Sequence, residues 1–352
     1  MEASDIFTEY GMGELQEGID ALFPDTGISL EKLWGQVFSG DVTGALGTLS
    51  GTVLSGFRSQ AAGMGDVFAW LMAIGIFSAL LHHFSEIFGK NRTEDTGFYV
   101  MYLLLITVVL KCFGQAADTT VTTLENVILF IRLLMPAFLL GVGMASGTAT
   151  LGAWYQLMLL LIYAVENILM AGVIPFVYVY VCLTVINGVW GEERLSLLMK
   201  LTAKGIRAVL KASLGVVTGI SAFQAMITPA LDAVRSSTLQ KLAASIPGIG
   251  GAADGIWETV LGSAVVIKNS IGVVMLLLLV ALCAAPLCKI LVIAGLLKAA
   301  AALMGIVSDK RITACTDQVG EGSLLLLKTA ASAMLLFAIS VSVVAAATNR
   351  GV

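Results

Sequence analysis

The sequence predicts an all-α protein: a polytopic bundle of about seven to nine transmembrane helices, preceded by an extracytoplasmic amphipathic helical segment. Hydrophobic residues make up 58% of the 352 positions and charged residues only 12%, and the mean hydropathy is +0.93. Such an apolar surplus requires an apolar solvent, because a soluble protein of this size needs a more polar surface. The surplus begins near residue 66, so we expect an acidic head over residues 1–65 and a transmembrane domain over residues 66–352.

The head combines a strong negative charge with one amphipathic helix. Residues 1–66 hold ten acidic residues against two basic ones, which argues against nucleic acid as a partner. The segment GISLEKLWGQVFSGD repeats its large apolar residues at helical spacing, namely Leu30, Leu33, Trp34, Val37 and Phe38. This spacing predicts a helix with one apolar face. We expect that face to lie on the bilayer, to pack on the membrane domain or to dock on a partner.

Apolar runs that can cross a hydrocarbon core of ~30 Å, which takes roughly 20 helical residues, follow the head. They cover residues 66–84, 97–117, 126–146, 151–190, 207–227, 269–305 and 323–347. The runs at 151–190 and 269–305 are too long for one straight crossing, and Pro175 and Pro286 mark the expected kinks or turns. Counting each long run once or twice gives the range of about seven to nine spans.

Lysine and arginine in the short loops predict the orientation. Loops 85–96 and 191–211 are basic, whereas loop 118–125 contains acidic residues only. Basic loops face the cytoplasm, so we expect the head outside the cell membrane. An even number of crossings between the two basic loops then requires that 151–190 cross twice.

Residues 228–268 form the longest segment behind the head that is not continuously apolar, and the predicted topology places it outside. Pro247 and Gly250 interrupt two short amphipathic stretches there, which predicts a helix, break, helix element or a re-entrant loop. A nucleotide-binding loop would need a preceding strand. We interpret IPGIGGAADG as a break between helices, and an ion or substrate site in a discontinuous helix is the alternative.

Catalytic constellations are missing from the sequence. The two histidines, His82 and His83, are adjacent, and neither an H-E-x-x-H pair, a Ser-His triad nor a G-x-x-x-x-G-K-[ST] loop can be assembled. The five cysteines show no C-x-x-C spacing and resemble small buried hydrophobic residues. We therefore expect no enzyme, no cofactor and no metal.

Ionisable residues within the apolar runs are more informative, because a charge at bilayer depth costs on the order of 3 kcal/mol unless it is paired or hydrated. Lys268 lies at the end of a run and is expected to snorkel. Arg132 and Glu166 lie deeper, where they pair across helices or line a polar conduit. Lys289 reaches water if its run turns at the proline, which leaves Lys298 to line an aqueous path or to meet a partner.

An ordered set of motifs carries a family resemblance: the GISLEKLWGQVFSGD helix, IPGIGG, an acidic helix at Glu258, VIKNSIG with Lys268 and Asn269, AAPLCKI with Pro286 and Lys289, and LLKAAAALMG with Lys298. With these motifs, the chain resembles the stage III sporulation protein AE family of endospore-forming bacteria over nearly its whole length. Members usually begin with a cleavable signal sequence. This chain begins at a head that resembles the mature protein, so we expect a trimmed or alternative start.

The resemblance implies a multi-pass protein of the mother-cell membrane around the forespore, within a secretion-like channel complex needed for late forespore development. It also implies partners: the other stage III sporulation A proteins, including a cytoplasmic ATPase and ring-forming proteins, and indirectly a forespore-side protein. It supplies no catalytic residue. Small residues in GLLKAAAALMG and KTAASAMLLFAIS favour close helix packing, either within the chain or in a homo-oligomer.

We therefore expect a membrane platform or export-gate component of that channel. A self-sufficient secondary transporter is the opposing hypothesis, with its site at the broken segments near Pro175, IPGIGG and Pro286.

Overall fold

The protein is helical throughout the part of the chain that the structure describes. The computed structural model describes residues 60–88, 93–146, 166–190, 195–243 and 250–347, with single positions and stretches of two or three residues before residue 60 and around residue 160. Its elements, in order, are α5 (Gly65–Phe88), α6 (Thr93–Ser146), the π-helix η1 (Glu166–Val173), α8 (Ile174–Trp190), α9 (Ser196–Ala243), α10 (Gly250–Met304) and α11 (Lys310–Ala347). No strand occurs in these ranges, which confirms the predicted all-α class.

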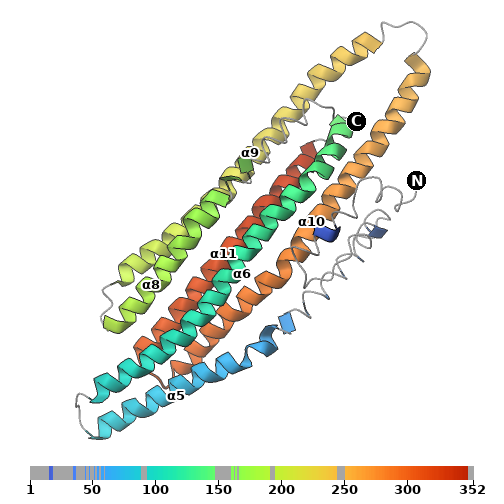
Figure 1. Cartoon of the computed structure of the whole chain (residues 1–352). Coiled ribbons are helices and arrows are strands. Elements are labelled where there is room, and N and C mark those ends of the chain that lie inside the picture. Colours follow the sequence, from blue (N-terminus) through green and yellow to red (C-terminus); the bar gives the residue numbers. More distant parts are fainter. Residues whose placement is uncertain are drawn as a thin grey trace.

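Helix α11 is the central element of the bundle. The long helices lie side by side along one axis, and α11 contacts α6, α8, α9 and α10, while α5 packs on α6 and α10 (Figure 1). In its most apolar stretch 56% of α11 is buried, against 33% for α6. The remaining apolar surface of the bundle is exposed, as expected for helices whose solvent is lipid.

The interior of the bundle is apolar, and hydroxyl groups are accommodated by their own helix. Leu325, Leu326 and Phe337 of α11 are almost completely buried. The buried hydroxyls of Thr316 and Thr329 donate to the carbonyl oxygens four residues earlier, at 2.9 and 2.8 Å. These bonds satisfy both hydroxyl donors without a partner on another helix.

Four helices in the described ranges are long and apolar enough to cross a membrane: Gly97–Leu133, Asn167–Val189, Gly272–Met304 and Lys310–Ser342. The predicted count of about seven to nine spans is not confirmed there. Helix α6, with 54 residues, measures about 80 Å at ~1.5 Å per residue. Its length exceeds a hydrocarbon core of ~30 Å, so a membrane-spanning α6 projects well beyond the bilayer.

The loop expected at residues 118–125 is not present, because α6 runs without a break through both predicted spans. Two acidic side chains interrupt the apolar pattern there, but charge alone does not end a helix, and the segment contains no glycine or proline. Thr119, Thr120 and Thr123 turn their hydroxyls back onto carbonyls of the same helix. The threonine hydroxyls are therefore accommodated within a helix that is continuous through the acidic stretch.

The two prolines have different consequences. Pro175 is the second residue of α8, which directly follows the π-helix η1. Proline has no N–H and its ring collides with the carbonyl one turn earlier, a conflict that a widened π turn accommodates. Pro286 lies inside the continuous helix α10. The turn expected in 269–305 is therefore not present, and packing of α10 against α6 and α11 keeps that helix intact.

Several predictions fall partly or wholly outside the described residues. The second crossing expected within 151–190 cannot be traced, because residues 151–159 lie outside them. The same holds for most of the head, so its amphipathic helix stays a prediction. In the predicted helix, break, helix element, α9 ends at Ala243 and α10 begins at Gly250, and residues 244–249 between them are not described.

Close packing of α11 against α8 depends on Gly322. A Cβ atom built on Gly322 lies 2.6 Å from Cγ2 of Val181, so Gly322→Ala forces the two helices apart. We expect a lower thermal unfolding midpoint in detergent, equivalent to about 1–3 kcal/mol of overpacking. Gly295→Ala is the matched control, since no atom lies within 4 Å of its Cβ, and it should hold or raise the midpoint. Equal midpoints for both variants would contradict this packing.

Candidate functional site: a charged cluster around Glu321

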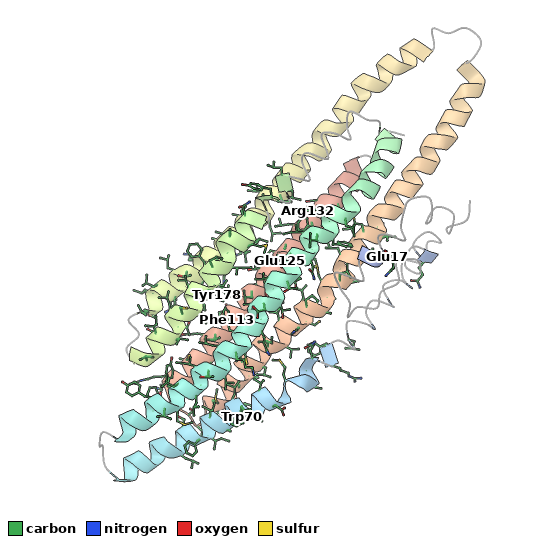
Figure 2. The ribbon with its side chains drawn as sticks, viewed as in Figure 1. Glu17, Trp70, Phe113, Glu125, Arg132 and Tyr178 are labelled. Carbon is green, nitrogen blue, oxygen red and sulfur yellow. The ribbon has the colours of Figure 1, made fainter. Side chains whose placement is uncertain are left out.

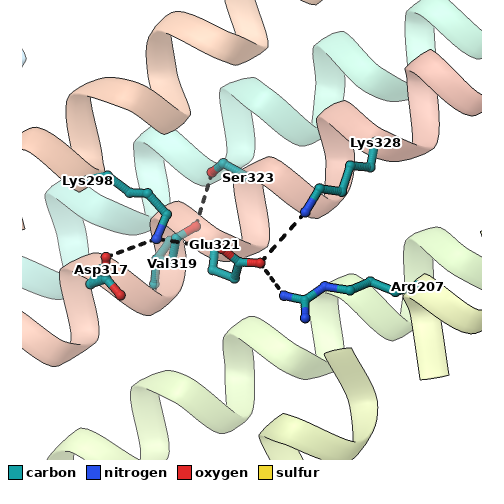
Figure 3. Close-up of polar contacts among 7 residues, drawn as sticks. All are labelled: Arg207, Lys298, Asp317, Val319, Glu321, Ser323 and Lys328. Atoms are coloured by element: carbon teal, nitrogen blue, oxygen red, sulfur yellow. Dashed lines mark hydrogen bonds and ion pairs between the residues drawn. The ribbon is translucent and has the colours of Figure 1, made fainter. Parts of the chain in front are cut away.

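Five charged side chains from three helices form a cluster around Glu321 (Figure 3). Its members are Arg207 of α9, Lys298 of α10, and Asp317, Glu321 and Lys328 of α11. The spacing of the three α11 residues, four and then seven positions apart, places them on one face of that helix. The cluster thus ties the central helix to two neighbours that are distant in sequence.

Glu321 is the shared acceptor of the cluster. The Arg207 guanidinium donates to Oε1 of Glu321, and the Lys328 ammonium lies 4.0 Å from the same oxygen. The Lys298 ammonium lies 3.6 Å from Oε2 of Glu321 and donates to Oδ1 of Asp317 at 3.0 Å. The Glu321 side chain is 22% exposed, less than any of its partners. Three cations therefore face two carboxylates, with the most shielded carboxylate at the centre.

Surroundings decide how much such a cluster stabilises the fold. An ion pair in water contributes about 0–1 kcal/mol, because solvent screens it and long side chains lose entropy. Charges beside an apolar bundle are different, since an unpaired charge close to lipid is costly. Removing Glu321 would leave Arg207, Lys298 and Lys328 close together without their shared counter-ion. We therefore regard Glu321 as the main polar tie of the bundle.

Glycines on both sides of Glu321 allow this close approach. A Cβ atom on Gly320 would lie 3.0 Å from Cγ of Lys298 and 3.3 Å from Cβ of Leu297. The Lys298 stem thus lies directly over Gly320, which brings its ammonium to the carboxylates. Gly322 makes the corresponding approach to α8. Small residues that admit a neighbouring helix are typical of membrane helix contacts.

The cluster contains Lys298, which the sequence analysis singled out as a cation within an apolar run. Its ammonium pairs within the chain with Asp317 and Glu321, and the expectation that it lines an aqueous path or meets a partner stays a prediction. Arg132 is an exposed residue of α6 and lies farther along that helix than Glu125 (Figure 2). Glu166 begins η1, but its side chain is not described. A pair between Arg132 and Glu166 therefore stays a prediction.

The other candidate residues lie away from this cluster or are described only in part. Lys289 and Pro286 are half-buried positions of α10. Only the backbone is described for four α10 residues: Gly250, Glu258, Lys268 and Asn269. Pro175 is exposed at the start of α8, and Pro247 lies outside the described residues.

Sequence reasoning missed Arg207, Asp317 and Glu321. It assigned Arg207 to the loop 191–211, and the two carboxylates lie between the apolar runs 269–305 and 323–347. A signal was present: Ile312, Cys315, Thr316 and Val319 are all buried on α11, and their spacing of three and four is helical. That spacing extends the helix back to the turn at residues 305–309 and places both carboxylates on it.

The described ranges also contain no group of His, Cys, Asp and Glu residues that could hold a metal ion.

The fold and its exposed apolar surface define the class, a helical membrane protein. The family profile for Stage III sporulation protein AE matches residues 28–348, and the chain belongs to this family. Stage III sporulation protein AE of Bacillus subtilis (strain 168) is 21% identical over 287 residues, which cover 81% of this chain and 72% of that relative. No solved structure matches the chain.

A charge exchange tests the pair between α9 and α11. Arg207→Glu places like charges beside Glu321, and Glu321→Arg gathers four cations, so each single variant should unfold several degrees below the native protein in detergent. The double variant restores opposite charges between α9 and α11 alone, because position 321 still faces Lys298 and Lys328, and it should recover part of the loss. Additive losses in the double variant would show that these two side chains do not interact.

Proposed function

We propose that this chain is a membrane platform or export-gate component of the mother cell to forespore sporulation channel, a secretion-like complex needed for late forespore development. Family membership over residues 28–348 carries the proposal. Four helices able to cross a membrane support it. The mechanism is assembly, and the proposal assigns no catalytic step and no cofactor.

Partners of the platform would engage it on both sides of the mother-cell membrane. We place the basic residues of 191–211 in the cytoplasm, facing the ATPase of the complex, because basic segments stay inside. The acidic head and the element at 228–268 would then meet ring-forming proteins outside, and through them the forespore-side protein.

The length of α9 and α10 supports a platform role. With 48 and 55 residues, the two helices measure roughly 70 and 80 Å. The end of α9 and the start of α10 both extend to the upper right of the molecule, beyond the other helices (Figure 1). Such arms reach past a hydrocarbon core of ~30 Å and offer a surface to partners.

A secondary transporter is the second candidate, favoured by the π-helix before Pro175. Irregular helices at membrane depth form substrate sites in many transporters. Uptake of a small solute by liposomes that contain only this purified chain would favour the transporter over the platform.

Photocrosslinking in sporulating cells tests the platform. A photoreactive residue at position 200 of α9 should capture cytoplasmic proteins of the sporulation complex, and one at position 240 should capture extracytoplasmic ones. Leu104, 52% exposed on α6, is the control position and should capture mainly lipid. Mass spectrometry identifies the adducts. If neither test position captures a protein of the complex, the platform role is wrong.

A further inference from the structure

A pocket of about 450 Å³ opens between α8, α9 and α11, next to the charged cluster. Its lining consists of Tyr180 from α8, Gln318 from α11, and Ser196, Met199, Lys200, Ala203, Lys204 and Arg207 from α9. Met199, Ala203 and Tyr180 are buried and form an apolar floor. Lys200 and Lys204 are exposed at the rim. The pocket thus combines a buried base with exposed cationic side chains at its rim.

The charged side chains that line this pocket are cations, while the two carboxylates near its Tyr180, those of Asp317 and Glu321, belong to the neighbouring charged cluster. Three of its lining residues are cations and none is a carboxylate. Lys211 extends the row along the same face of α9, and the first acidic residue of that helix is Asp232. Like charges one helical turn apart repel each other, so the row favours a bound anion.

The cations differ in how far they are already neutralised. Arg207 pairs with Glu321, whereas Lys200 and Lys204 have no carboxylate within 4.0 Å among the described residues. Ser196 begins α9, so the positive end of the helix dipole lies at the pocket. The Ser196 hydroxyl and the Gln318 amide add uncharged hydrogen-bond donors. Ammonium groups, a hydroxyl, an amide and a helix N-terminus together suit a phosphate group.

Apolar residues beside the lysines indicate where that phosphate comes from. Leu197, Leu198 and Leu201 are 77%, 50% and 66% exposed, and they lie on the same two turns of α9 as the lysines. A small soluble anion would make no apolar contact with the exposed leucines, so these side chains would not contribute to its binding. A phospholipid does, because its acyl chains cover the leucines while lysine side chains reach its headgroup.

We infer that this pocket binds the phosphate of an anionic phospholipid, held by Lys200 and Lys204 and flanked by the leucines of α9. The site goes beyond the platform role and requires only that the protein reside in a membrane. Arg207 borders both the pocket and Glu321, so a bound headgroup adds negative charge beside the tie between α9 and α11.

Lipid binding to the purified full-length protein tests the site. Native mass spectrometry after titration with phosphatidylglycerol counts the bound lipid, with phosphatidylcholine as the neutral comparison. Juxtamembrane basic residues contribute about fivefold each to binding of anionic lipid, so Lys200→Gln with Lys204→Gln should weaken phosphatidylglycerol binding roughly 25-fold. Phosphatidylcholine binding should not change. Lys200→Arg with Lys204→Arg should retain phosphatidylglycerol, which separates loss of charge from misfolding.

The matched control removes the same charge elsewhere. Lys111→Gln with Lys310→Gln changes two exposed lysines that do not line the pocket, and it should bind phosphatidylglycerol as the native protein does. An equal loss in both glutamine variants would mean that net charge alone matters, and the site would be refuted. Inorganic phosphate that displaces phosphatidylglycerol at equal concentration would also overturn the lipid assignment, since the leucines would then contribute nothing.

Discussion

Glu321 provides the directional interaction on which the arrangement of the central helices depends. Helices in lipid gain little from burying apolar surface against each other, because lipid chains are as apolar as their side chains. Apolar packing also tolerates sliding, whereas a carboxylate shared by Arg207 and Lys298 fixes both helices at one height. Gly320 and Gly322 make this possible by removing side chains on either side of the carboxylate. The ion pairs of Glu321 and the close helix contacts at Gly320 and Gly322 therefore lie in the same turn of α11.

Helix length links this central tie to the proposed role. The cluster lies near the end of α10 and near the starts of α9 and α11, so these three helices continue far beyond it in one direction. A bundle fixed at one level can hold long arms in a defined direction, as a platform for other proteins requires. The proposed lipid pocket beside Arg207 would place the charged cluster close to phospholipid headgroups at the membrane surface.

The sequence predicted the helical class and the family, because composition and ordered motifs determine both. It also identified Lys298 as an unusual residue, since a cation in an apolar run needs a partner. It did not predict the continuity of α6, where acidic residues interrupt the hydropathy pattern but not the backbone. The ion pair between Arg207 of α9 and Glu321 of α11 was not predicted either. The two residues are separated by 114 positions, and hydropathy carries no information on which residues pair across that distance.

A disulfide between α10 and α11 tests the register of these helices most directly. The Cβ atom built on Gly320 lies 3.3 Å from Cβ of Leu297, close to the ~3.5–4.5 Å that a disulfide requires. Leu297→Cys with Gly320→Cys, in a chain without its native cysteines and with a protease site in the turn at 305–309, should keep its two fragments joined after oxidation in membranes. Gly295→Cys with Gly320→Cys is the control and should separate. Separation of the Leu297 pair as well would contradict the register that brings Lys298 to Glu321.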